Sequence, residues 1–405
     1  MEAASISIVL LTVVLWGTLG NRAGSVMITA PIVFVVAGYV YVDVVGVIHL
    51  DVEAEPVKVL AEVTLAWVLF VEASALNLHR RPPDLGTEVR LLGLGLPLTI
   101  GLGAVVASTL LGYGAWEALL VAAAVAATDA AMGAAVIGNP RVPARARRAL
   151  SLESGLNDGI VLPIVMLAIA GVAADLGVEG VHEPGRAVVD LLVGALVGAV
   201  VGAVGGGLVR EARRHGWLKE DLVGVTLLSL ALLAFSTALV VDSNGFVAAF
   251  VAGLLFSWTT RLTKAREIEY VKETSSLASM LTWLVFGALA LPTMGQWTDW
   301  RVFTFALLSL TLVRLLPIAL SLVGSGLERA EVMVIGLFGA RGLPSVIFAL
   351  IVLENLHEQG RELVAAIALT VVLSVVMHGL AGGLLARGLT ADRGSWPSAR
   401  RTPRP

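Results

Sequence analysis

Long apolar stretches fill most of this 405-residue chain. A helix needs about 20 mostly apolar residues to cross the hydrocarbon core of a bilayer, which is roughly 30 Å thick. Thirteen stretches of about this length can be counted, and they run approximately over residues 3–21, 26–48, 57–78, 89–111, 115–137, 151–176, 187–209, 221–242, 244–260, 275–293, 302–324, 331–353 and 362–386. The chain is therefore predicted to be an all-α polytopic membrane protein.

The composition agrees with this prediction and excludes other classes. Hydrophobic residues make up 57% of the chain and charged residues 15%, whereas soluble domains have about 45–50% and about 25%. The absence of cysteine excludes disulfides, thiol chemistry and thiolate metal sites. The net charge of −3 gives no reason to expect a nucleic-acid partner. We expect no cofactor, and membrane lipid as the surroundings.

The basic residues predict how the chain crosses the membrane. One set of alternating loops, with the C-terminal tail, holds 22 Lys and Arg residues, and the opposite set holds 4. Basic loops stay in the cytoplasm, so we expect an integral plasma (inner) membrane protein with its N-terminus outside and its C-terminus inside. Residues 388–405 are expected to be a short, disordered cytoplasmic tail. Thirteen spans allow two inverted six-helix repeats around a linking helix, with crossing helices 5 and 12 broken.

Some charged and polar side chains fall within the predicted spans, where they are costly and usually functional. Arg314 could neutralise a buried acid or extend along its helix to the surface, and His378 could sense pH or be a satisfied buried residue. The remaining candidates lie in spans 3, 5, 6 and 12, and they are Glu72, Thr128, Asp129, Glu153, Ser154, Asn157, Asp158 and Arg341.

Helical spacing sorts the polar residues of span 6 into two rows. Ser154 and Asp158 are four residues apart and share one face, and Glu153 and Asn157 share a neighbouring face. One row can face a site while the other faces a supporting helix. Arg341 is the best candidate to neutralise Glu153, which leaves the carboxylates of Glu72, Asp129 and Asp158 nearest an ion.

Helix breakers favour an oxygen-lined site. Gly339, Gly342 and Pro344 interrupt span 12, and Thr128 and Asp129 can interrupt span 5 through bonds to the backbone. Carboxylates, hydroxyls and freed carbonyls are the ligands that hard cations prefer. The same buried acids also favour their protonated form. Competition between a cation and protons at one site, exposed alternately to each side, would be an antiport mechanism.

Three motifs carry a resemblance to a known family. ATDAAMG in span 5, ESGLNDG in span 6 and GARGLPS in span 12 resemble the monovalent cation:proton antiporters of the NhaP-like, sodium/proton-exchanger type. The resemblance implies that Asp158 carries the ion and the proton. It implies ion ligands at Thr128, Asp129 and Ser154, and Glu72 falls where the family often has an acid. It further implies that Glu153 and Asn157 pair with Arg341.

The same resemblance implies an architecture. A transmembrane domain over 1–387 would contain core helices at about 89–176 and 302–386, a dimerisation side at about 3–78 and 221–293, and a linker helix at 187–209, and two copies would form a homodimer. Asn157 in place of a second Asp implies electroneutral exchange. Ala130 and Pro344 depart from the family pattern and affect where the helices break.

We therefore expect a transporter rather than an enzyme, namely an electroneutral Na⁺(or K⁺)/H⁺ antiporter. The choice among Na⁺, K⁺ and Li⁺ is left open. The alternative is a cation-coupled carrier of another small solute on the same inverted-repeat fold. Acids outnumber arginines by four to two in the buried set, which argues against an anion carrier. A channel would conduct at rates far above a carrier's, and the Gly-x-Gly-Asp motif of an intramembrane aspartyl protease does not occur.

Overall fold

Helices joined by short turns make up the part of the chain that the computed structural model describes, which comprises residues 3–25, 29–46, 55–75, 85–129, 132–139, 142–219, 222–260 and 265–391. Ala130 lies outside these residues, as do 392–405 of the predicted tail. The last helix, α17, continues to Ala391, past the expected end of the transmembrane domain at 387.

The helical elements fall into thirteen successive passes, at the places expected from the apolar stretches. The first three are α1 (Ala3–Ser25), α2 with η1 (Ala30–Tyr39, Val40–Val44) and α3 (Glu55–Ala75). The fourth consists of α4 (Leu85–Arg90), η2 (Leu91–Gly95), α5 (Leu96–Val106) and η3 (Ala107–Leu111). The next three are α6 with α7 (Ala115–Ala124, Ala134–Ile137), α8 (Ala144–Leu176) and α9 (Pro184–Arg214). The last six are α10 (Val223–Val240), α11 (Gly245–Thr260), α12 (Ala265–Trp297), α13 with α14 (Trp300–Leu310, Leu312–Ser321), α15 with α16 (Arg329–Leu337, Leu343–Leu356) and α17 (Arg361–Ala391), which follows the short η5 (His357–Gly360).

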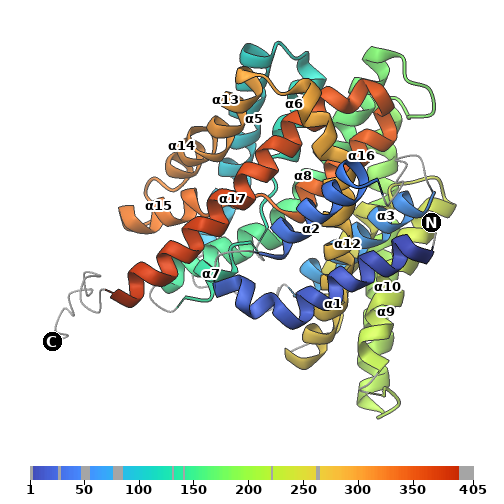
Figure 1. Cartoon of the computed structure of the whole chain (residues 1–405). Coiled ribbons are helices and arrows are strands. Elements are labelled where there is room, and N and C mark those ends of the chain that lie inside the picture. The colour runs from blue at the N-terminus through green and yellow to red at the C-terminus, as the bar shows by residue number, and fades with distance from the viewer. Residues whose placement is uncertain are drawn as a thin grey trace.

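Length and composition mark many of these helices as membrane-crossing. Seven helical stretches of the described chain are long and apolar enough to span a bilayer, and four shorter apolar helices accompany them. Helices α13, α14 and α15 lie on one side of the molecule, and α9 and α10 lie on another (Figure 1).

Small residues bring neighbouring helices together. α2 packs along α12, and a Cβ on Gly38 would lie 1.9 Å from the carbonyl oxygen of Leu284. The reverse contact is equally close, because a Cβ on Gly287 would lie 2.1 Å from the carbonyl oxygen of Val35. Lipid tails are as apolar as the helix surfaces, so close packing of this kind is what holds membrane helices together.

Two passes are broken, as the sequence predicted. The fifth pass stops after Ala124 and resumes at Ala134, and the twelfth stops after Leu337 and resumes at Leu343. A third interruption, at Thr311 between α13 and α14, was not predicted; its φ of −118° and ψ of −93° depart from helical values. All three breaks lie close to the polar residues of the candidate site.

Candidate functional site

The two predicted breaks lie against each other. The backbone N–H of Asp129, just beyond α6, donates to the carbonyl of Ala340 at 2.8 Å. The carboxylate of Asp129 accepts a hydrogen bond from the N–H of Leu343 at 3.1 Å. Leu343 is the first residue of α16, where N–H groups have no partner within the helix and a negative charge is favourable. Asp129 therefore caps the helix that begins in the other broken pass.

Gly342 makes this approach possible, because a Cβ there would lie 2.1 Å from Oδ2 of Asp129. Pro344 occupies the second position of α16, where its missing N–H would have had no helical partner. The expectation that Pro344 breaks the helix is therefore corrected: it lies at the start of α16. The break itself comprises residues 338–342, including the predicted Gly339 and Gly342.

Arg341 caps the C-terminal ends of two helices, whereas Asp129 caps an N-terminal end. Its buried guanidinium donates to the carbonyl of Ala126 at 2.9 Å, at the end of α6, and to the carbonyl of Ser309 at 3.3 Å, near the end of α13. The Ser345 hydroxyl adds a 2.7 Å bond to the carbonyl of Ala124. A cation favours such carbonyl-rich helix ends. Ser345 was not among the predicted residues, although it closes the GARGLPS motif.

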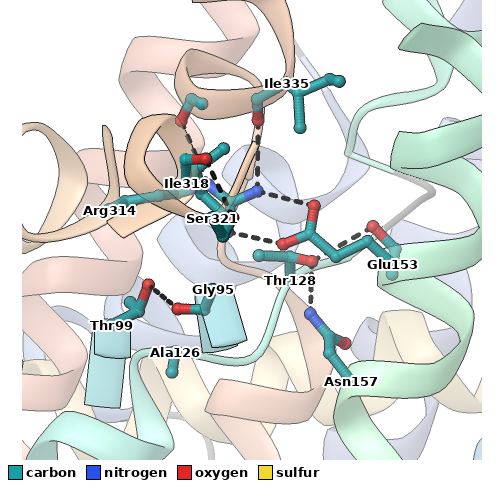
Figure 2. Close-up of polar contacts among 12 residues, drawn as sticks. Gly95, Thr99, Ala126, Thr128, Glu153, Asn157, Arg314, Ile318, Ser321 and Ile335 are labelled. Atoms are coloured by element: carbon teal, nitrogen blue, oxygen red, sulfur yellow. Dashed lines mark hydrogen bonds and ion pairs between the residues drawn. The ribbon is translucent and has the colours of Figure 1, made fainter. Parts of the chain in front are cut away.

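Glu153 forms its ion pair with Arg314, and the predicted pairing with Arg341 was wrong. Nη1 of Arg314 lies 3.0 Å from Oε1 of Glu153, and Nη2 donates to Oε2 at 3.1 Å. Both side chains are at most 3% exposed, and Figure 2 shows the guanidinium of Arg314 directed at this carboxylate. The break at Thr311 lies just before Arg314 in the chain. The guanidinium of Arg341 instead donates hydrogen bonds to carbonyls near the ends of α6 and α13.

Arg314 also closes the end of α15. It donates to the carbonyls of Gly336 at 3.1 Å and Ile335 at 3.3 Å, and a Cβ on Gly339 would lie within 1.8 Å of its Nε. Of the two readings left open for Arg314, the structure shows the first, neutralisation of a buried acid.

A second polar network joins α8 to the break in the fifth pass. The amide of Asn157 donates to Oγ1 of Thr128 at 2.6 Å (Figure 2), and this oxygen lies 3.2 Å from Oγ of Ser154. The three side chains are buried. The predicted pairing of Asn157 with Arg341 is thus replaced by a bond to Thr128. One residue from each row on α8, Ser154 and Asn157, therefore contacts Thr128, whereas Glu153 pairs with Arg314.

Asp158 is a buried acid of α8. It is 1% exposed, and neither carboxylate oxygen receives an N–H or hydroxyl donor from the described residues. Its charged neighbours are the carboxyl groups of Glu72 on α3 and Asp129. Glu72 and Asp129 therefore lie near enough to Asp158 to act on its charge.

No three His, Cys, Asp or Glu side chains of the described chain stand close enough together to hold a metal ion. An ion beside Asp158 would need hydroxyl, amide and carbonyl oxygens as well as carboxylates. Ser154, Thr128 and Asn157 supply such oxygens nearby. The ligand set named from the sequence remains a prediction.

His378 is a buried residue of α17 with several hydrogen-bond partners. Its Nε2 lies 3.0 Å from the carbonyl of Leu337, the last residue of α15, and its Nδ1 lies 3.2 Å from Oγ of Ser374. Oγ of Ser374 in turn accepts from the backbone N–H of Arg341 at 2.7 Å. Ser374 was not predicted, although its spacing of four residues from His378 in one helix places the two on one face.

A family model described as "Sodium/hydrogen exchanger, transmembrane" matches residues 7–388. The chain belongs to this family. It is therefore a membrane transporter and not an enzyme, as the motifs predicted.

Two relatives of this family member come from Schizosaccharomyces pombe. A probable Na⁺/H⁺ antiporter is 25% identical over 214 residues, which cover 50% of this chain and 27% of the relative. A Na⁺/H⁺ antiporter is 25% identical over 253 residues, which cover 57% of this chain and 52% of the relative. The matches thus span about half or less of these longer proteins.

Solved structures show the fold. The sodium proton antiporter MjNhaP1 from Methanocaldococcus jannaschii at pH 8 matches with a TM-score of 0.78 and 20% identity, covering 96% of this chain and 98% of that one. A structure of the same antiporter from an electron-microscopy map matches with a TM-score of 0.74. The predicted NhaP-like fold, with its inverted repeats and broken crossing helices, is confirmed.

Proposed function

We propose that this family member is an electroneutral Na⁺/H⁺ antiporter in which Asp158 carries the ion and the proton in turn. Membership of the sodium/hydrogen exchanger family and the names of the relatives support the substrates. The observation that carries the assignment is the state of Asp158: a buried carboxylate with no N–H or hydroxyl donor from the described residues. Such a group needs a bound cation or a proton, because an isolated buried charge is costly.

Three other charged residues of the site have partners of their own. Glu153 is neutralised by Arg314, Asp129 faces the N-terminus of α16, and Arg341 faces the C-terminal ends of α6 and α13. Among these contacts of the described residues, Asp158 has no basic partner. One exchangeable positive charge at Asp158 supports an exchange of one proton for one monovalent cation.

The mechanism follows from competition at this carboxylate. At low proton concentration, Asp158 is charged and binds a cation, with help from the oxygens of Ser154 and Thr128 and from the carboxylate of Glu72. At high proton concentration, protonation displaces the cation. Exposure of the site first to one side and then to the other couples the two fluxes, because either ligand neutralises the same group before the site moves.

Reconstituted vesicles test this proposal. An outward-directed gradient of Na⁺, K⁺ or Li⁺ should drive proton uptake, and an imposed membrane potential should leave the rate unchanged if the exchange is electroneutral. Asp158→Asn should abolish exchange while the protein remains folded. Glu153→Gln is not a suitable control because it leaves Arg314 buried without its partner. Full exchange by Asp158→Asn would refute the role of Asp158.

The two-part organisation and the dimer are also proposals. α11 packs on α9 and α3, and α12 packs on α2, whereas α6 packs on α8 and α5. This supports a dimerisation side formed by helices from 3–78 and 221–293, which meets the core where α12 packs on α16 and α17 and where α3 packs on α8. Mass measurement in detergent tests the homodimer, and labelling of single cysteines placed at each end tests whether the N-terminus lies outside.

A further inference from the structure

Helix α11 is held on two sides by contacts between backbones. Three glycines of α9 face it, at positions 194, 198 and 202, and a Cβ on each would lie 2.2–2.4 Å from a carbonyl oxygen of Asn244, Ala248 or Ala252. On α11 itself, a Cβ on Gly253 would lie 2.4 Å from the carbonyl oxygen of Phe70 on α3. Backbone atoms cannot give way without moving a whole helix, so α3, α9 and α11 behave as one body.

The contact of α11 with α8 is of a different kind. It includes the ring of Phe250, which lies over Gly159, so that a Cβ on Gly159 would lie 2.1 Å from Cζ of the ring. A flat apolar ring on a residue without a side chain presents no interlocking groups. Such a surface can slide, whereas interdigitated side chains of a packed core resist displacement.

This contact lies beside the carrier. Gly159 follows Asp158 in α8, and Phe250 is 8% exposed and Asp158 1% exposed. The ring therefore covers the helix at the position next to the carboxylate. α3 and α9 also pack on α8, so the ring is one of the contacts between the body formed by α3, α9 and α11 and the core helix that holds the site.

We propose that Phe250 on Gly159 is the sliding seal of the transport cycle. The ring closes the site of Asp158 from one side, and it must cross Gly159 when the site changes its access. This inference rests on the proposed antiport function and adds to it the residues that set the rate of the conformational step. Gly159 is needed because any side chain there would stand in the path of the ring.

A rate measurement with a second-site rescue tests the seal. Gly159→Ala should lower the maximal exchange rate at least tenfold and leave the KM for Na⁺ within about twofold, because the ion ligands are retained. Phe250→Ala in the same chain should restore at least half of the lost rate. A wild-type rate in Gly159→Ala, or a loss that Phe250→Ala does not relieve, would overturn the proposal.

The chain supplies a matched control on the same helix. A Cβ on Gly171 of α8 would lie 2.1 Å from the ring of Trp116, which comes from the core helix α6. Gly171→Ala therefore adds the same steric overlap inside the core. It should lower the thermal stability but leave the maximal rate per folded protein unchanged. If it slowed exchange as much as Gly159→Ala, the special role of the Phe250 contact would be wrong.

Thiol chemistry gives a readout that does not depend on the transported ion, since the native chain has no cysteine. Gly159→Cys should react slowly but completely with a small membrane-permeant maleimide, and faster once Phe250→Ala is added. Complete protection in both backgrounds would overturn the seal. Absence of Na⁺- or K⁺-driven proton movement in the wild type, with labelling as expected, would refute the proposed function and not the moving contact.

Discussion

Asp129 and Arg341 each stabilise the broken pass to which the other belongs. Asp129 follows α6 and accepts the N–H of the first residue of α16, and Arg341 precedes α16 and donates to a carbonyl at the end of α6. The backbones are also joined, by the bond from Asp129 to Ala340. Each charge lies at the helix end that favours its sign, so the two breaks form one structural unit.

Because Asp129 caps α16 through a hydrogen bond, its substitutions should differ in how much stability they cost. Asp129→Asn keeps an oxygen that can accept from Leu343, so most of the cap should survive. Asp129→Ala removes the acceptor and should cost about 0.5–2 kcal/mol of stability, the usual range for a lost N-cap. Thermal unfolding in detergent at one pH measures both. Equal losses for the two variants would contradict capping by a hydrogen bond.

The ion pair between Glu153 and Arg314 predicts strong coupling. Removing one partner leaves the other charge buried, which typically costs about 3–5 kcal/mol, so Glu153→Gln and Arg314→Gln should each lower the stability severely. The double variant should recover a substantial part of the sum of the two losses.

A control for this cycle is the exposed pair of Arg214 with Glu211, separated by 3.4 Å. Exposed pairs contribute about 0–1 kcal/mol, so Arg214→Ala should change the unfolding temperature little. Additive losses at Glu153 and Arg314 would show that the observed pair carries no interaction energy.

The sequence predicted the elements better than their pairings. The apolar stretches locate the thirteen passes, and the glycines of GARGLPS locate the break before α16. The partner of Glu153 could not be found in this way, because periodicity along α8 tells which residues share a face and not which helix covers that face. Arg314 and Arg341 were both buried cations, and the unpredicted break at Thr311 helps to decide between them.

Capping is a role of Asp129 that the sequence did not reveal. Asp129 as an ion ligand remains a prediction, and one of its oxygens also accepts the N–H of Leu343. A cap between two passes far apart in sequence depends on how the breaks meet in space. The pairing of Asn157 with Thr128 was missed for the same reason.

The hydroxyl of Thr128 is predicted to organise the ion site. Thr128→Val keeps the shape but leaves the Asn157 amide without its acceptor and Ser154 without its partner. Since a buried unsatisfied polar group costs about 1–3 kcal/mol, the KM for the cation should rise roughly tenfold, which corresponds to about 1.4 kcal/mol. Exchange rates over a range of Na⁺ concentrations measure the change.

Thr370→Val is the matched control for this variant. Thr370 is also fully buried, but within the described part of the chain its hydroxyl bonds only the carbonyl of Ala366 in its own helix, at 2.8 Å. Its loss should leave the KM unchanged. If Thr370→Val raised the KM as much as Thr128→Val, the effect would come from burial of a polar group in general and not from the network with Asn157.

His378 is predicted to act as a neutral capping residue and not as a pH sensor. Nε2 lies 3.0 Å from the carbonyl oxygen of Leu337, and Nδ1 lies 2.8 Å from the carbonyl oxygen of Ser374 in the same helix. A neutral imidazole can donate to only one of these two carbonyls, and because a buried charge is costly we expect the neutral form, with its N–H on Leu337. His378→Gln retains an N–H donor for Leu337, whereas His378→Ala leaves this carbonyl at the end of α15 unbound. We therefore expect His378→Gln to keep the pH profile of exchange, and His378→Ala to lose about 1 kcal/mol of stability. Exchange measured between pH 6 and pH 9 decides the question, because a titrating histidine changes charge within this range and its replacement by Gln would move the profile.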